Sequence, residues 1–155
     1  MPAESPNPGL VEFIHDLVES TNRRDVHALV SHYAPDAVLD TSHWEMGIYE
    51  GPAAIRRVFT HWMDVYEDVE IGADEVLALG SGVVLAVFRE SGRPYGRDHR
   101  VRVRVAWVYE WAEGLIVRAT AFRDIDEARV AARQAAAERV AAERAAARRA
   151  AAPRG

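Results

Sequence analysis

Apolar residues recur with the period of a helix along the first part of the chain. One amphipathic helix is predicted between residues 7 and 21, and a shorter one between Asp25 and Pro35, since proline does not continue a helix. After a short strand, residues 37–42, a third helix begins at Pro52, and its apolar stripe consists of Ile55, Val58, Phe59, Trp62 and Tyr66. Three helices are therefore expected in the first half of the chain.

From residue 69 the apolar period becomes two, which is the period of a strand. Four strands are predicted, at residues 69–79, 82–92, 99–111 and 115–124. In the third strand, valine and aromatic side chains share one face, and the other face carries Arg100, Arg102, Arg104 and Glu110. Helices followed by such strands predict an α+β domain. Its strongly curved, mostly antiparallel sheet would wrap around a long helix and enclose a pocket.

Residues 129–155 consist mainly of alanine, arginine and glutamate, which favour an extra C-terminal helix. Val130 and Val140 are the apolar side chains that this helix could bury, so two interpretations stay open. The helix is a solvated overhang, or it docks on a second subunit. The chain is accordingly divided into a flexible leader, residues 1–7, a domain, residues 8–128, and this helical tail.

Composition narrows the classes of function. A chain of 155 residues, 49% of them hydrophobic, suits one globular domain. The absence of cysteine excludes disulfides and a cysteine nucleophile, and a Schiff-base lysine is excluded because all 19 basic residues are arginine. Seven arginines and two glutamates give the tail a charge of +5, so residues 1–128 carry −10, which argues against nucleic-acid binding. Without a signal peptide or a membrane-spanning apolar run, a cytoplasmic protein is expected.

Three segments carry a family resemblance: "HYAPDAVLDTS", "YEGPAAIRRVF" and "WVYEWAEGLIVRATAFRD". They resemble the SnoaL-like branch of the nuclear-transport-factor-2-like superfamily, and the resemblance covers about residues 8 to 128. It implies a cystatin-like cone. This superfamily contains ketosteroid isomerases, polyketide cyclases, scytalone dehydratase and limonene epoxide hydrolase, so the fold alone does not select a reaction.

The catalytic positions of these relatives hold other residues in this chain. The resemblance aligns the general base of the ketosteroid isomerases with Thr41, one place after Asp40, and their oxyanion-stabilising tyrosine with Leu17. The partner acid of the isomerases and a histidine of the polyketide cyclases both align with Trp107, and an aspartate of the cyclases aligns with Ala121. None of the known catalytic sets is intact.

Asp40 and His43 are the candidate catalytic residues. A carboxylate at a pocket wall can have a raised pKa and remove a proton from a carbon acid, and a histidine can act as acid or base near neutral pH. Strand alternation puts Leu39 and Thr41 inward, so Asp40 reaches the pocket only if the strand ends or bulges there. The alternative for His43 is a surface loop histidine.

The residues expected to contact a substrate are Thr41, Trp44, Trp62, Trp107, Tyr109 and Arg123. Trp44 either covers a planar ligand or packs beneath its loop. The indole of Trp107 can orient a ligand oxygen but cannot transfer protons. Arg123 either binds a carboxylate or enolate oxygen in the pocket, or forms a surface ion pair with Asp124 or Asp126.

No metal and no cofactor is expected. The histidines lack a metal-site spacing, and the glycine-containing turn at residues 80–82 joins two strands, so it is not a phosphate loop. The arginine row of the third strand either pairs with neighbouring acids such as Glu75 or Glu90, or meets an acidic patch of a second subunit. The family resemblance favours a homodimer through this outer sheet face.

Three functions stay open. The first is a cofactor-independent enzyme that acts on a small, largely apolar carbonyl metabolite, polyketide- or terpenoid-like. Its proton transfer would lead to isomerisation, cyclisation, dehydration or hydrolysis. The second is a non-catalytic protein that binds a small apolar or aromatic molecule. The third is a homodimeric protein-interaction domain that uses the sheet face and the tail.

Overall fold

The computed structural model describes residues 8–153 and confirms the α+β fold. The helices are α1 (Pro8–Asn22), α2 (Val26–Val30), α3 (Pro52–Asp64) and α4 (Ile125–Ala151), with a 3₁₀ turn, η1 (Ser42–Trp44). The strands are β1 (Tyr33–Asp40), β2 (Ile48–Glu50), β3 (Tyr66–Gly80), β4 (Val83–Pro94), β5 (Val101–Ala112) and β6 (Leu115–Phe122). They form one curved sheet in the order β2-β1-β6-β5-β4-β3, in which the β1–β6 pair is parallel and the others are antiparallel. The predicted leader, residues 1–7, lies outside the described part.

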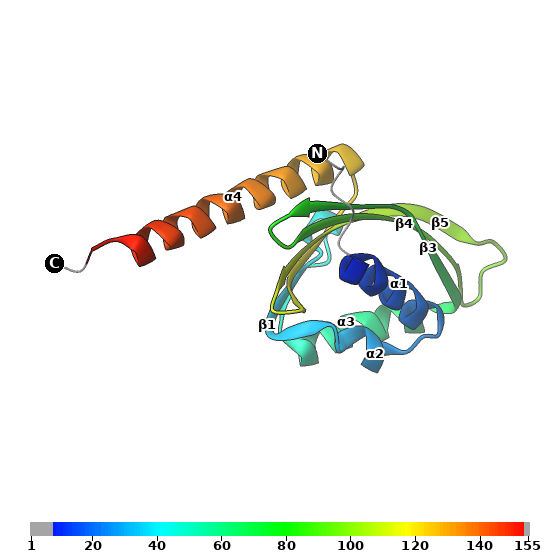
Figure 1. The fold of residues 1–155 in the computed structure, drawn as a ribbon. Helices are drawn as coiled ribbons and strands as arrows, with labels where there is room; N and C mark the ends of the chain where they lie inside the picture. The colour runs from blue at the N-terminus through cyan, green and yellow to red at the C-terminus, as the bar shows by residue number, and fades with distance from the viewer. Residues whose placement is uncertain (1–7, 154–155) are drawn as a thin grey trace.

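The two faces of the sheet are covered by different helices. α1, α2 and α3 lie on the concave side, and α4 runs across the convex side (Figure 1). β4 is buried on both faces, and all six residues from Val83 to Phe88 are buried. This explains the continuous apolar run in its sequence, which is typical of a strand covered from both sides.

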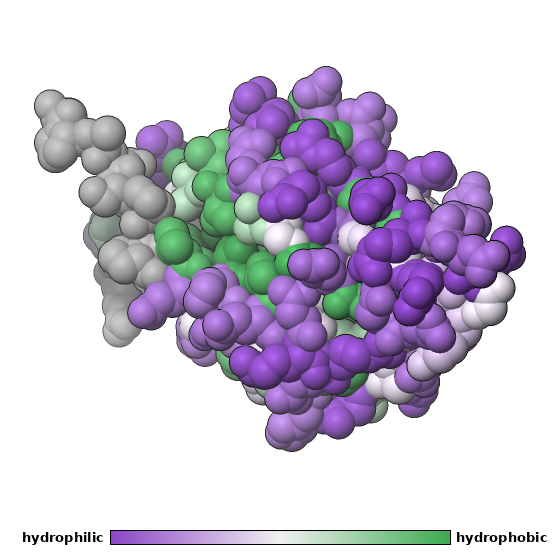
Figure 2. Space-filling view, turned by 90° about the vertical axis from the view of Figure 1, so that its right-hand side faces the viewer, coloured by the Kyte–Doolittle hydropathy of each residue, from purple (hydrophilic) through white to green (hydrophobic). Residues whose placement is uncertain are grey.

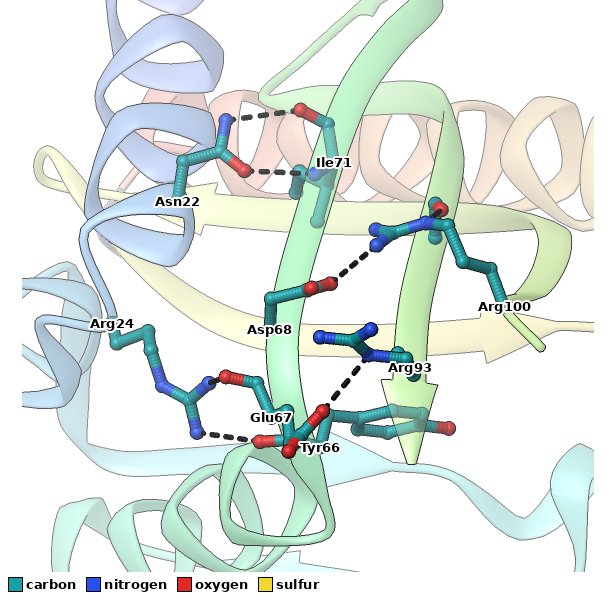
Figure 3. A network of polar contacts seen from close by, with 9 residues as sticks. Asn22, Arg24, Tyr66, Glu67, Asp68, Ile71, Arg93 and Arg100 are labelled. Atoms are coloured by element: carbon teal, nitrogen blue, oxygen red, sulfur yellow. Dashed lines mark hydrogen bonds and ion pairs between the residues drawn. The ribbon is translucent and has the colours of Figure 1, made fainter. Parts of the chain in front are cut away.

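The end of α1 is joined to β3, the edge strand of the sheet (Figure 3). The Asn22 side chain donates to the Ile71 carbonyl at 3.0 Å and accepts from the Ile71 N–H at 2.8 Å, as a neighbouring strand would. The Arg24 guanidinium donates to the carbonyls of Glu67 and Tyr66, each at 3.0 Å. These contacts fix the edge of the curved sheet against α1 and satisfy backbone groups that an edge strand otherwise leaves open.

α4 packs on the convex face of its own sheet. The sequence had left open a solvated overhang or a helix docked on a second subunit. Ala128 and Ala132 are fully buried and Ala136 is 8% exposed, and they pack on apolar residues of β4, β5 and β6. Val130, which was expected to be buried, is 60% exposed. Three alanines spaced by four residues share one helix face and let the helix approach the sheet closely. The expected division at residue 129 falls inside this helix, whose second half projects beyond the sheet (Figure 1).

The prediction also differs from the structure around β1. The second helix ends at Val30 and does not continue toward Pro35, because β1 already begins at Tyr33. Pro35 lies where the pairing of β1 with β6 shifts register, between Tyr33 and Val38. A strand tolerates proline at such an irregularity because no ladder hydrogen bond is lost. The three-residue β2 was not predicted.

Polar side chains cover most of the outside of the cone. Figure 2 views the molecule from the side on which β3, β4 and β5 lie in Figure 1, and hydrophilic residues dominate this face except for a hydrophobic patch in its left half. Val11 of α1 and Leu77 of β3 are among the larger apolar side chains that stay exposed, each at 45%. Within residues 8–153, no helix is long and apolar enough to cross a membrane.

Candidate functional site

A cavity of about 420 Å³ lies between the concave face of the sheet and α3. It has the size of typical small-molecule sites, roughly 300–1,000 Å³. Its walls are mainly aromatic and aliphatic, and they include Thr41, Trp44, Phe59, Trp62, Tyr66, Glu90, Trp107 and Ala121. A smaller chamber of about 40 Å³ shares Phe59, Trp62, Glu90 and Trp107 with it and adds Tyr33 and Tyr109.

Glu90 is the carboxylic acid that lines both chambers. On β4 it follows Ala86 and Phe88 on the concave side, and its partners in the neighbouring strands are Val103 and Ile71. Burial raises the pKa of Glu90 to about 7. Among the described residues, no hydrogen bond or ion pair reaches its carboxyl group. Such an acid can both take up and give up a proton at neutral pH.

The role expected for Glu90, as an ion-pair partner of the arginine row, is wrong. Arg89 is the residue of β4 that lies opposite Arg104, and the two arginines share Asp74 on the convex side. Glu90 is the next residue along the strand and therefore points to the other face. Glu75 does meet an arginine, but this is Arg129 of α4, at 2.7 and 2.8 Å.

Asp40 lies outside the cavity. Its neighbours Leu39 and Thr41 line the cavity, as strand alternation predicts, and the Asp40 carboxylate accepts from Arg118 at 2.8 Å and from the Ser42 hydroxyl at 2.6 Å. Burial opposes ionisation, but the hydrogen bonds from Ser42 and the charge of Arg118 outweigh it and lower the pKa of Asp40. A carboxylate that is held ionised and paired on the convex side is poorly placed to take a proton from a molecule in the cavity.

His43 and Arg123 also stay outside the cavity. The exposed His43 ring stacks on Phe122, with 4.4 Å between ring centroids. The Arg123 guanidinium lies over the Trp44 ring, 5.2 Å from its centroid, which is neither of the two positions expected for it. These contacts place both side chains at the outer surface of η1 and the end of β6.

Thr41, Trp62, Trp107 and Tyr109 face the concave side as their patterns predict, and Trp44, for which two positions were open, lies in the cavity wall. Thr41, Trp44, Trp62 and Trp107 line the larger cavity, and Thr41 donates its hydroxyl hydrogen to the Gly47 carbonyl at 2.8 Å. Tyr109 stacks on Trp107, with 5.7 Å between the ring centroids, and borders the smaller chamber.

Tyr33 and Tyr109 are the hydroxyl-bearing aromatic residues of the smaller chamber. Burial raises the pKa of both phenols above the usual range, and for Tyr109 the neighbouring Tyr33 and Glu90 add to the rise. Both hydroxyls therefore stay protonated and can donate a hydrogen bond beside Glu90.

A second hollow, about 1,020 Å³, lies at the other end of the cone. It is formed by the start of α1 and the β3–β4 and β5–β6 turns, and it contains none of the predicted site residues. Among the described residues, no group of three or more histidine, aspartate or glutamate side chains is arranged to hold a metal ion. We therefore place the candidate site in the cavity that contains Glu90.

Several solved structures share the fold of this chain. One is a protein with a ketosteroid isomerase-like fold from Catenulispora acidiphila, in complex with trimethylamine (TM-score 0.66, 15% identity, covering 76% of this chain and 86% of that one). Another is a candidate polyketide cyclase from Sinorhizobium meliloti (TM-score 0.60, 22% identity, covering 71% of this chain and 93% of that one). A third is an LEH-like epoxide hydrolase from M. tuberculosis (TM-score 0.61, 15% identity, covering 76% of this chain and 84% of that one). At these identities the likeness shows the fold alone.

The sequence itself gives the family. It matches the SnoaL-like domain family over residues 14–119, and the chain belongs to that family. The resemblance expected from the sequence is thereby confirmed. No curated protein sequence matches this chain.

Proposed function

We propose that this protein is a cofactor-independent enzyme that moves a proton on a small, largely apolar carbonyl compound, with Glu90 as the proton carrier. The observation that carries the proposal is an unpaired carboxylic acid, with a pKa of about 7, in an apolar cavity of about 420 Å³. A general acid or base is most effective when its pKa lies near the working pH. Glu90 meets that condition, whereas Asp40 is paired with Arg118.

The proposed step transfers one proton from a carbon of the substrate to a carboxylate oxygen of Glu90. The Glu90 carboxylate removes a proton from the carbon next to the carbonyl group, which leaves an enolate and a neutral Glu90. Tyr109 or Tyr33, both held protonated beside Glu90, can donate a hydrogen bond to the enolate oxygen. Return of the proton to another carbon completes an isomerisation. Loss of a leaving group or attack on a second carbonyl would complete a dehydration or a cyclisation.

The remaining cavity residues would bind and orient the substrate. Trp62 and Trp107 border both chambers, so a planar compound between them would lie against Glu90. Thr41 and Trp44 lie on the side of the larger cavity formed by the end of β1 and η1. Aromatic walls favour polyketide- or terpenoid-like compounds over highly polar ones. Fold relatives described as a polyketide cyclase and an epoxide hydrolase are in keeping with an enzyme that acts on a small molecule.

Deuterium exchange tests the proposal without knowledge of the full reaction. A panel of cyclic ketones and aromatic polyketides is incubated with the protein in D₂O, and deuterium uptake next to the carbonyl is followed by NMR. We expect exchange with at least one class, and a loss of about 10²–10⁴-fold in the Glu90→Gln variant. Asp40→Asn is the matched control and should retain the exchange rate.

Two outcomes would contradict the proposal. Exchange that persists in Glu90→Gln would exclude Glu90 as the proton carrier. Binding without exchange, seen as saturable quenching of Trp44, Trp62 and Trp107 fluorescence, would instead favour the non-catalytic binding protein.

The homodimer through the outer sheet face stays a proposal, with a changed surface. Because α4 covers the apolar part of the convex face, a second subunit could contact only the arginine-rich part beyond it, which includes the exposed Arg102 and Arg104. Light scattering after gel filtration would detect the dimer, and Arg102→Glu should weaken it.

A further inference from the structure

The cavity contains an acidic group, Glu90, without an arginine or lysine partner in the described part of its wall. Of the described residues that line it, none is an arginine, and the chain has no lysine. The lining does include a histidine, His61, but this residue is exposed on α3. An ionised carboxylate in an apolar cavity is costly unless a counter-charge accompanies it. Glu90 either stays neutral in this cavity or, when it is ionised, gains its counter-charge from a cationic ligand.

The walls around Glu90 suit a particular kind of cation. Aromatic residues dominate the cavity wall, and they are Trp44, Phe59, Trp62, Tyr66 and Trp107. The face of an aromatic ring attracts a cation, and alkylated ammonium groups are recognised by such aromatic sets because their methyl groups also favour apolar walls. Trp44 already has a cation on its outer side, since the Arg123 guanidinium lies 5.2 Å from its ring centroid.

We propose that the cavity selects a substrate that carries an alkylated ammonium group, with Glu90 as the counter-charge and the tryptophans as the aromatic wall. The inference concerns the same site as the proposed function and rests on it for the reaction. It adds the substrate class, which is an amine-bearing carbonyl compound. The bound cation would also keep Glu90 ionised, so that the binding of the substrate produces the carboxylate that removes the proton. Anionic compounds should be rejected.

A pair of isosteric probes separates charge from shape. Choline and the neutral 3,3-dimethylbutan-1-ol differ in one nitrogen, and tryptophan fluorescence with saturation-transfer NMR can follow the binding of both. We expect choline to bind at least tenfold more tightly at pH 8. In Glu90→Gln this preference should fall at least tenfold, while the affinity for the neutral alcohol changes little. Glu70→Gln, which removes an exposed carboxylate from β3, is the matched control and should keep the preference.

The results that contradict an ammonium-bearing substrate differ from those that contradict the proton-transfer reaction. If choline does not bind, or binds no better than its neutral isostere, or keeps its preference in Glu90→Gln, the ammonium-bearing substrate is wrong. Glu90-dependent deuterium exchange on neutral ketones would then still support the proton-transfer enzyme. Conversely, a Glu90-dependent preference for choline, without exchange on any amine-bearing ketone, would support the cation site and contradict the reaction.

Discussion

On the convex face of the sheet, carboxylates lie against arginines, whereas on the concave face Glu90 has no charged partner among the described residues. The convex pairs are Asp40 with Arg118, Asp68 with Arg100, Asp74 with Arg89, Glu75 with Arg129, and Glu110 with Arg139. Hydrogen bonds and arginine charge lower the pKa of Asp40 and Glu75, whereas burial alone acts on Glu90 and raises its pKa. The contrast separates these paired acids of the convex face from Glu90, the acid that lines the concave cavity.

The two faces of the sheet also differ in how tightly their side chains are packed. α4 meets the convex face through alanines, and its small side chains let the backbone come close, so that the contact is filled. On the concave face, large rings from α3 and β5 meet across a cavity of about 420 Å³. The convex face is therefore built for stability and the concave face for a ligand, and the following changes test this contrast.

The largest expected effect is that Glu90→Gln stabilises the protein at high pH. The folded-state pKa of about 7 lies above the ordinary value of 4.5, so the folded protein binds more protons than the unfolded chain between these values. The stability of the folded protein is then lost as pH rises through this window, by about 3 kcal/mol in total. Urea unfolding at pH 4 and pH 8 should show a more stable variant at pH 8 and a smaller difference at pH 4. A variant that is destabilised at pH 8 would show that Glu90 has a partner.

A matched pair of alanine substitutions tests the packing contrast. Ala132 is fully buried between α4 and the convex face of the sheet, so Ala132→Leu should cost about 1–3 kcal/mol through overpacking. Ala121 lines the cavity, so Ala121→Leu should place its extra atoms in free space and cost less than about 1 kcal/mol. Thermal and urea unfolding measure both. Equal costs would mean that the cavity is filled in solution.

A smaller effect with the opposite pH dependence is expected for Asp40→Asn. The lowered pKa of Asp40 means that its ionised form stabilises the fold above its ordinary pKa of 3.8, and this contribution is lost as pH falls through the lower folded-state value. The variant should lose about 1–2 kcal/mol at pH 7, the usual worth of a charged hydrogen bond, and less near pH 3. Urea unfolding across this range gives the comparison, and a loss that does not depend on pH would contradict the ion pair with Arg118.

The sequence was sufficient to predict those elements that show a periodic pattern of apolar residues. Amphipathic helices and alternating strands predicted the α+β fold. The apolar stripe of the third helix assigned Trp62 to the cavity wall, and strand alternation assigned Trp107 to it, and both lie there. The sequence also contained the signal for Glu90, because Ala86 and Phe88 precede it at a spacing of two on the inner face. That signal was missed because a lone acid on a strand is usually solvated.

Other features could not be obtained from one sequence. The docking of α4 depends on alanines, whose pattern is weak because alanine is common on exposed helix faces as well. The stacking of Arg123 on Trp44 depends on how η1 folds back over the end of β6, and no periodic pattern encodes such a contact. β2 is three residues long, which is too short for an alternating pattern to be recognised.

The most direct test of the central claim is a pH titration of the Glu90 side-chain carboxyl carbon by NMR, in protein labelled with ¹³C, with Glu90→Gln used to assign the signal. An unpaired acid buried in the cavity predicts a midpoint near pH 7. A midpoint near the ordinary value of 4.5 would contradict the account, because Glu90 would then be solvated or paired, and no acid suited to proton transfer would remain in the cavity.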